Sequence, residues 1–227
     1  MMLERHRGFM DGLFAVAARG HASVPLDVLA SLTALAIVPF LLMMCTSFVR
    51  IVVVLSLVRS AIGASALPPN AVLSGLALVL TLVVMTPTLQ RIGHDALEPY
   101  GRGALTQSQA LDRATAPLRD FMLRQTRVAD IELFERVAHR RSEAPGAAPL
   151  VVLVPAFVVG ELRGAFAIGF ALYLPFVAID LAVAAMLMGL GMMMLSPPVV
   201  SLPVKLLLFV MVDGWALICG GVAASFR

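Results

Sequence analysis

The residues with the most distinctive chemistry lie near the end of the chain, in the stretch MGLGMMMLSPP. It contains three consecutive methionines, Met192, Met193 and Met194, inside a long uncharged apolar run. Methionine has three rotatable bonds and a polarizable sulfur, so its side chain repacks easily against a changing neighbour. The run predicts a soft apolar surface; for any single methionine, the alternative is a gap filler between helices.

The residues around the methionines predict an interruption of helical structure. Gly189 and Gly191 allow a break in helix geometry and a close approach of another backbone. Pro197 and Pro198 follow Ser196, and proline cannot continue a helix because it lacks the N–H donor. We therefore expect a hinge or helix break on both sides of the methionines.

Charged residues also interrupt the apolar parts of the chain. A charge at the centre of a bilayer costs at least ~2.5 kcal/mol, so such residues rarely face lipid. We expect them to face one another, other subunits or a water-filled path. These residues are Arg50, Arg59, Glu161, Arg163, Asp180, Lys205 and Asp213.

These charges fall into different classes. Asp180, Lys205 and Asp213 are candidates for buried charges. Glu161 and Arg163 suggest a buried polar pair at an interface, with a helix cap among lipid headgroups as the alternative. Arginines near helix ends, in contrast, can reach the headgroups with their long side chains.

Enzyme chemistry finds little support in the sequence. The four histidines, His6, His21, His94 and His139, lie in terminal or loop-like segments without metal-ligand spacing. No phosphate-binding glycine loop, nucleophile motif or pair of carboxylates in a predicted cleft is apparent. The two cysteines, Cys45 and Cys219, show no pairing pattern. The sequence therefore predicts no catalytic residues, no metal and no cofactor.

Composition places the chain among membrane proteins. Of its 227 residues, 60% are hydrophobic and only 14% are charged, and the mean hydropathy is +0.94. Ordinary soluble domains are about 45–50% apolar and about 25% charged. The net charge is +3, but the basic residues form no stripe and few aromatic residues accompany them, so nucleic-acid binding is not predicted.

The apolar residues divide the chain into four parts. Residues 28–90 and 149–227 are predicted to form two long apolar helical hairpins, separated by a small polar helical domain and linker at 91–148. Residues 1–27 are a lead-in that resembles a secretory signal peptide only poorly, with an exposed amphipathic segment as the alternative. The apolar stretches within the hairpins are Val28–Val49, Ala71–Gln90, Pro149–Ile179 and Leu181–Gly221.

The small polar domain has nearly balanced charges and a helical spacing of apolar residues. We expect one kink or break in it near Pro117. The fold class predicted for the whole chain is therefore all-α.

Ordered motifs through the chain resemble the FliP family of type III export-gate proteins. They cover about Leu29 to Phe226 and comprise LLMMCTSFVRIVVVLSLVRSAIGASALPPN, APLRDFMLRQTRVADIELF, LVPAFVVGELRGAFAIGFALYLPFVAID, MGLGMMMLSPP and VKLLLFVMVDGW. The PLRDFMLRQT segment looks more like the flagellar branch than the virulence-secretion branch. The family more commonly has SELK where this chain has GELR. This difference bears on the contacts that these residues make and not on the resemblance to the family.

This resemblance implies a structural role in protein export. Proteins of this family form a ring of five copies, joined by FliQ-like and FliR-like subunits, with their helices wound together. The ring lies in the bacterial inner membrane at the flagellar basal body, among other membrane proteins of the export apparatus. Its helices are raised toward the periplasmic side. It passes unfolded flagellar polypeptides and does not involve nucleic acid.

The resemblance also implies roles for individual residues. Met192, Met193 and Met194 correspond to a methionine gasket at the narrowest point of the channel, where an apolar constriction closes by dewetting. Phe121, Phe134, Glu161 and Arg163 are implied as subunit-contact candidates. For Phe121 and Phe134, ordinary core positions in the small domain are the alternative.

Two other functions are consistent with the sequence. One is the equivalent subunit of a virulence type III secretion system. The other, which the sequence favours less, is a transporter of small solutes, which should show an inverted internal repeat and a broken helix facing its substrate. No such repeat is apparent between the two apolar halves.

Overall fold

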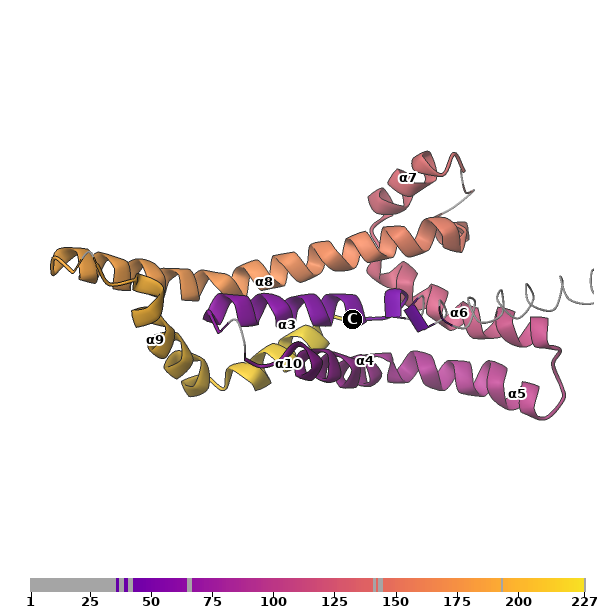
Figure 1. The fold of residues 1–227 in the computed structure, drawn as a ribbon. Helices are drawn as coiled ribbons and strands as arrows, with labels where there is room; N and C mark the ends of the chain where they lie inside the picture. The colour runs from indigo at the N-terminus through magenta and orange to yellow at the C-terminus, as the bar shows by residue number, and fades with distance from the viewer. Residues whose placement is uncertain are drawn as a thin grey trace, which may run out of the picture. The chain divides into compact units, whose positions relative to one another are not determined.

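The computed structural model describes residues 36, 39–40, 43–64, 67–140, 142, 145–192 and 194–226, so the lead-in predicted for 1–27 lies outside the described residues. Within the described part, every regular element is helical and no strand occurs, which confirms the all-α prediction. Figure 1 shows the arrangement. In chain order the elements are α3 (Phe48–Ile62), α4 (Asn70–Ile92), the π-helical turn η1 (Gly93–Leu97), α5 (Glu98–Gly101), α6 (Gln107–Gln125), α7 (Val128–Val137), the 3-10 turn η2 (Pro145–Ala147), α8 (Leu150–Gly189), α9 (Pro197–Met211) and α10 (Gly214–Ala224).

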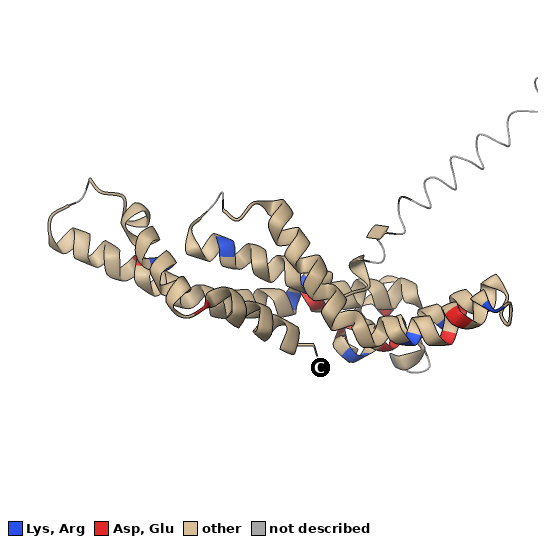
Figure 2. Cartoon of the chain, turned by 90° about the horizontal axis from the view of Figure 1, so that it is seen from below, with Lys and Arg blue, Asp and Glu red and all other residues tan. Residues whose placement is uncertain are grey.

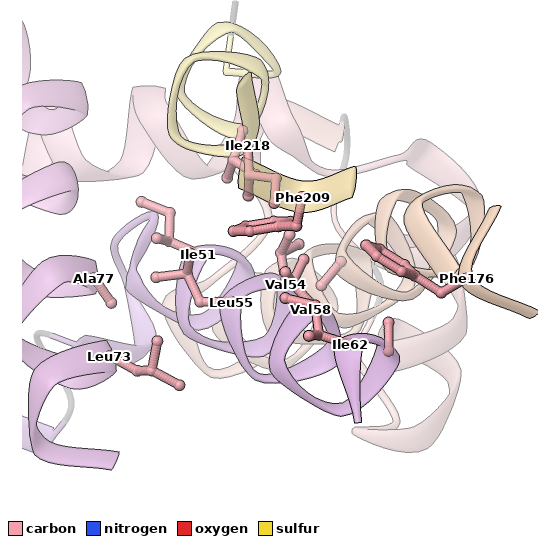
Figure 3. Packing of buried hydrophobic residues seen from close by; sticks show 13 residues of the cluster. Ile51, Val54, Leu55, Val58, Ile62, Leu73, Ala77, Phe176, Phe209 and Ile218 are labelled. Atoms are coloured by element: carbon pink, nitrogen blue, oxygen red, sulfur yellow. The ribbon is translucent and has the colours of Figure 1, made fainter. Parts of the chain in front are cut away.

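Helix α3 lies at the centre of the main apolar core because apolar side chains occupy several of its faces. Ile51, Val54 and Leu55 are fully buried, and burying one such side chain contributes about 1.5–3 kcal/mol. Figure 3 shows how α3 is surrounded by the other apolar helices. The neighbouring core residues are Leu73 and Ala77 of α4, Phe176 of α8, Phe209 of α9 and Ile218 of α10.

Helix α8 is a single helix of 40 residues that contains Pro155 and Pro175. In the sequence, Asp180 separates two apolar stretches, but α8 continues through it. Its carboxylate accepts a hydrogen bond from Lys205 of α9. The approach of α3 to α8 is close at Gly169, where a Cβ would overlap the side chain of Leu57. Glycine therefore lets these two helices pack tightly.

The small polar domain packs on the first half of α8. Helices α6 and α7 share a second core with α4 and α8, in which Met85, Met122, Ile131 and Phe157 are almost fully buried. A kink or break was predicted near Pro117; no break occurs, since α6 continues through this residue, and a kink stays a prediction. The helix instead ends at Gln125, and α7 begins at Val128.

The apolar halves contain helices that are long enough to cross a membrane. Two described segments meet this condition by length and composition, Asn70–Gly101 and Leu150–Gly189. Helices α9 and α10 meet it only as a pair, and they are bent by 64°. The second apolar half thus forms three helices, α8 to α10, and the arrangement as two hairpins stays a prediction.

Charged residues are unevenly distributed over these helices. They gather around the end of α4, α5 and α6, whereas the second half of α8 and the helices that follow are almost free of charge (Figure 2). The few charges within the apolar helices are paired in most cases.

Candidate functional site

The methionine segment lies at the end of α8, in a turn that leads to α9. The turn is a Schellman motif, in which the N–H of Gly191 donates to the carbonyl of Met188 at 3.0 Å and the N–H of Met192 donates to that of Leu187 at 2.9 Å. Gly191 has φ +73, a left-handed conformation that side chains with a Cβ rarely adopt. The glycine therefore ends the helix immediately before the methionines.

The described methionines of this turn are exposed in the single chain. Met192 is 47% exposed, and Met194 is fully exposed at its side chain. Met193 lies outside the described residues. Because Met192 and Met194 follow the last residues of α8, they do not lie on a regular helix. Met192 and Met194 are therefore not related by the fixed rotation of ~100° per residue that a regular helix would impose.

The predicted hinge residues have different roles in the structure. Pro197 and Pro198 do not interrupt a helix. They are the first residues of α9, where the fixed φ of proline suits a helix start. Gly189 is the last residue of α8, and no neighbouring atom lies within 4 Å of a Cβ placed there. Within the chain, Gly191 is thus the residue that produces the break.

An ion pair between the buried Lys205 and the partly exposed Asp180 fixes α9 against α8. Lys205 Nζ donates to Asp180 Oδ2 at 2.5 Å and to the carbonyl of Ala61 at 3.3 Å. Ser201 Oγ donates to the other carboxylate oxygen, Asp180 Oδ1, at 2.5 Å. The ammonium group of Lys205 is buried, so these hydrogen bonds compensate for its lost hydration. The cluster joins α8 and α9 to the end of α3.

Asp213, the third candidate for a buried charge, is exposed in the single chain. It has φ +48 and precedes α10, at the bend between α9 and α10. Burial of Asp213 would require another subunit and stays a prediction.

A second buried ion pair joins α3 to α8. Arg50 Nη2 donates to Glu161 Oε1 at 2.6 Å, and both side chains are almost fully buried. The sequence analysis suggested that Glu161 pairs with Arg163. The structure shows instead that Glu161 pairs with Arg50. In the described part of the chain, Glu161 Oε2 and Arg50 Nε have no hydrogen-bond partner.

The C-terminal turn covers Arg50 from the other side. Arg50 Nη1 donates to the carbonyl and to the hydroxyl of Ser225, at 3.2 Å and 3.1 Å. The guanidinium carbon Cζ lies 4.1 Å from the centroid of the Phe226 ring, a cation–π contact. Phe226 in turn stacks on Phe121, with ring centroids 6.3 Å apart. Arg50 thus connects α3, α8 and the C-terminal end of the chain.

Arg163 pairs with the small polar domain instead. Its two terminal nitrogens donate to the two carboxylate oxygens of Asp130 on α7, each at 2.8 Å. This bidentate hydrogen bonding from Arg163 lowers the pKa of Asp130, because it stabilises the ionised carboxylate. The pair therefore fixes α7 on α8 at neutral pH.

The two phenylalanines predicted as subunit contacts lie inside the chain. Phe121 is buried in the second core and makes an edge contact with Phe157, and Phe134 is partly buried against the same core. These positions agree with the alternative of ordinary core residues. A contact with another subunit through either ring stays a prediction.

The sequence reasoning did not identify several residues of these clusters. Ser201 and Lys205 are four residues apart on α9, a spacing that places both on one face and could have suggested a shared partner. No such local signal links Arg50 to Ser225 or Arg163 to Asp130, because these partners are far apart in the sequence.

Comparisons with known proteins give a consistent family assignment. The model of the FliP family matches residues 31–222. The flagellar biosynthetic protein FliP of Pectobacterium carotovorum subsp. carotovorum is 49% identical over 205 residues, which cover 90% of this chain and 80% of that protein. The protein of the same name from Bacillus subtilis (strain 168) is 42% identical over 215 residues, 94% of this chain and 97% of that protein. The one from Buchnera aphidicola subsp. Acyrthosiphon pisum (strain APS) is 46% identical over 90% of this chain and 54% of that protein.

Proposed function

The chain belongs to the FliP family, and from this premise we propose that it is a channel-forming subunit of the flagellar type III protein export gate. In this role it passes unfolded flagellar proteins across the bacterial inner membrane at the basal body. The relatives named above are flagellar biosynthetic proteins, which supports the flagellar branch over the virulence-secretion alternative.

The observation that carries the proposal is the exposed methionine turn. A gate for unfolded chains of any sequence needs a narrow ring that is apolar, deformable and without a strong binding site. Met192 and Met194 are exposed in this turn, while the ion pair of Asp180 and Lys205 fixes the helices on both sides. Flexible apolar side chains on a rigid support suit a seal that closes by dewetting and repacks around a passing chain.

The exposed apolar surface supports assembly with other subunits. Large apolar side chains are exposed along α8 from Phe166 onward and along α9, more than a free monomer usually exposes to water. We propose that they are covered in a ring of five copies with FliQ-like and FliR-like subunits, next to other membrane proteins of the export apparatus. These residues include Phe166, Phe170, Leu174, Leu181, Leu207, Val210 and Met211.

The charges within the apolar helices fit such an assembly. Arg50 with Glu161 and Lys205 with Asp180 are paired inside the chain, so their burial needs no lipid contact. We propose that the assembled helices are raised toward the periplasmic side of the inner membrane. Phe121, Phe134, Glu161 and Arg163 remain the proposed subunit-contact positions.

The gasket is tested by replacing Met192, Met193 and Met194 together with alanine in cells that assemble the export complex. We expect the ring to assemble and the resting membrane to leak ions, because alanine leaves the constriction wider and less able to dewet. Membrane conductance is measured, with assembly checked by purification of the complex. The matched control is alanine at Met186 and Met188, exposed methionines on the last turns of α8. Unchanged conductance in an assembled triple variant would contradict the proposal.

A further inference from the structure

A pocket lined by both charged and apolar residues lies near the end of α4, and the export function proposed above does not use it. Its volume is about 430 Å³, and it lies between the end of α4, the π-helical turn η1, α5 and α6. The lining residues that matter here are Arg91, His94, Asp95, Pro99, Arg113 and Pro117.

Arg91 and Arg113 line this pocket, and both have N–H donors that make no hydrogen bond to another described residue. Arg113 is exposed and makes no ion pair with any residue that the structure describes. Arg91 uses one terminal nitrogen for Asp120, at 3.0 Å, but a guanidinium group has five N–H donors. Two guanidinium groups that line one pocket favour an anion with several oxygens, above all a phosphate.

The acidic group of the pocket is already paired. Asp95 Oδ1 lies 2.8 Å from His94 Nδ1, and both residues belong to the π-helical turn η1. Within this pocket, Arg113 makes no ion pair with any described residue, and Arg91 keeps N–H donors beyond the one it uses for Asp120. Short π-helical segments occur frequently at functional sites, and here one carries two of the lining residues.

The position of the pocket indicates what the phosphate is attached to. The pocket begins at Arg91, the first charge after the uncharged residues 71–90 of α4, and Figure 2 shows the charged region that follows. Apart from one buried stripe, α4 is exposed and apolar, with Val79, Leu82, Val83 and Leu89 at its surface. A ligand with an anionic head and apolar tails fits this boundary, because its tails can lie along α4.

We propose that this pocket binds the phosphate group of a membrane phospholipid, with Arg91 and Arg113 as the phosphate donors. Pro99 and Pro117 form an apolar part of the pocket wall beside the lipid headgroup. Basic pockets at the polar ends of apolar helices bind lipid headgroups in this way.

The proposal is tested by titrating the full-length chain, purified in detergent micelles, with phosphatidylglycerol and measuring the Kd by native mass spectrometry. Arg113→Gln should raise the Kd about tenfold, because it removes charge-assisted hydrogen bonds. Arg91→Gln combined with Arg113→Gln should raise it further. Arg124→Gln, an exposed arginine on the same helix but outside the pocket, should leave the Kd unchanged.

Two further probes separate the sources of binding. Inorganic phosphate should compete only weakly, and diacylglycerol with the same acyl chains should bind more weakly than phosphatidylglycerol. An unchanged Kd for Arg113→Gln would overturn the pocket. Equal affinity for inorganic phosphate would overturn the lipid as the source, and equal affinity for diacylglycerol would overturn the role of the phosphate. None of these measurements depends on export.

Discussion

At the scale of single residues, the structure explains how charges persist in an apolar chain. Arg50 with Glu161 and Lys205 with Asp180 each join two helices, and Arg50, Lys205 and Asp180 have further hydrogen-bond partners. Arg50 and Glu161 are both almost fully buried, so removing one of them would cost about 3–5 kcal/mol, because the remaining charge would stay buried without compensation. The pairs therefore specify which helices pack together, and they do so at positions where an apolar contact would be less selective.

The pair of Asp130 and Arg163 predicts a pH dependence of stability. The folded state lowers the pKa of Asp130, so the pair stabilises the fold above the ordinary pKa of the carboxylate and loses this effect as the pH falls through the lowered value. Asp130→Asn should reduce the free energy of unfolding by about 1 kcal/mol at pH 7, since Arg163 is partly exposed. The difference between the two proteins should shrink as the pH falls below about 4.

Thermal unfolding of the purified chain in detergent, measured at several pH values, checks this prediction. Glu98→Gln provides the control, because Glu98 pairs with Arg102 on the surface, where a single ion pair contributes little. A destabilisation by Asp130→Asn that is the same at every pH would show that the ion pair is not its cause.

At the scale of elements, a glycine and not a proline determines where the longest helix ends. Gly191 adopts the left-handed conformation that closes the Schellman motif at the end of α8, and the methionines follow directly. Pro197 and Pro198 then start α9. The methionine segment is thus a turn whose ends are fixed by two different local devices.

Gly191→Ala should lower the free energy of unfolding by about 1 kcal/mol, because alanine is strained at a positive φ. Gly189→Ala is the matched control two residues away: its site is helical and open, so alanine should be neutral or slightly stabilising. Chemical or thermal unfolding of both variants in detergent gives the comparison. Equal effects at the two glycines would contradict the role assigned to Gly191.

At the scale of the whole molecule, the chain is organised around one apolar helix and one charged region. Helix α3 is enclosed by α4, α8, α9 and α10, whereas the outer faces of α4, α8 and α9 remain apolar and exposed. Exposed apolar faces of this extent are typical of surfaces that bind lipid or another protein.

Native mass spectrometry of the solubilised export complex tests the proposed assembly. We expect a species with five copies of this chain together with FliQ-like and FliR-like subunits, because those subunits would cover the exposed faces of α8 and α9. A monodisperse monomer under conditions that preserve other complexes of the export apparatus would argue against the ring.

Much of this architecture could be predicted from the sequence, because its causes are local. The apolar composition and the helical spacing predict helices of membrane type, and the ordered motifs predict the family. The methionine segment also stands out in the sequence. Its neighbouring glycines led to the expectation of a helix break, and Gly191 has the positive φ at the end of α8. Steric restriction of the backbone and the pattern of apolar residues act within a few residues, so the sequence shows them directly.

The tertiary structure decided which side chains meet. Glu161 is two residues from Arg163 but pairs with Arg50, which is 111 residues away. Neighbours two apart on a helix point in different directions, so the partner of a buried charge depends on which helix packs against that face. In the same way Phe121 became part of a core, and Pro117 stayed inside α6. These outcomes depend on contacts between distant segments, which only the folded chain brings together.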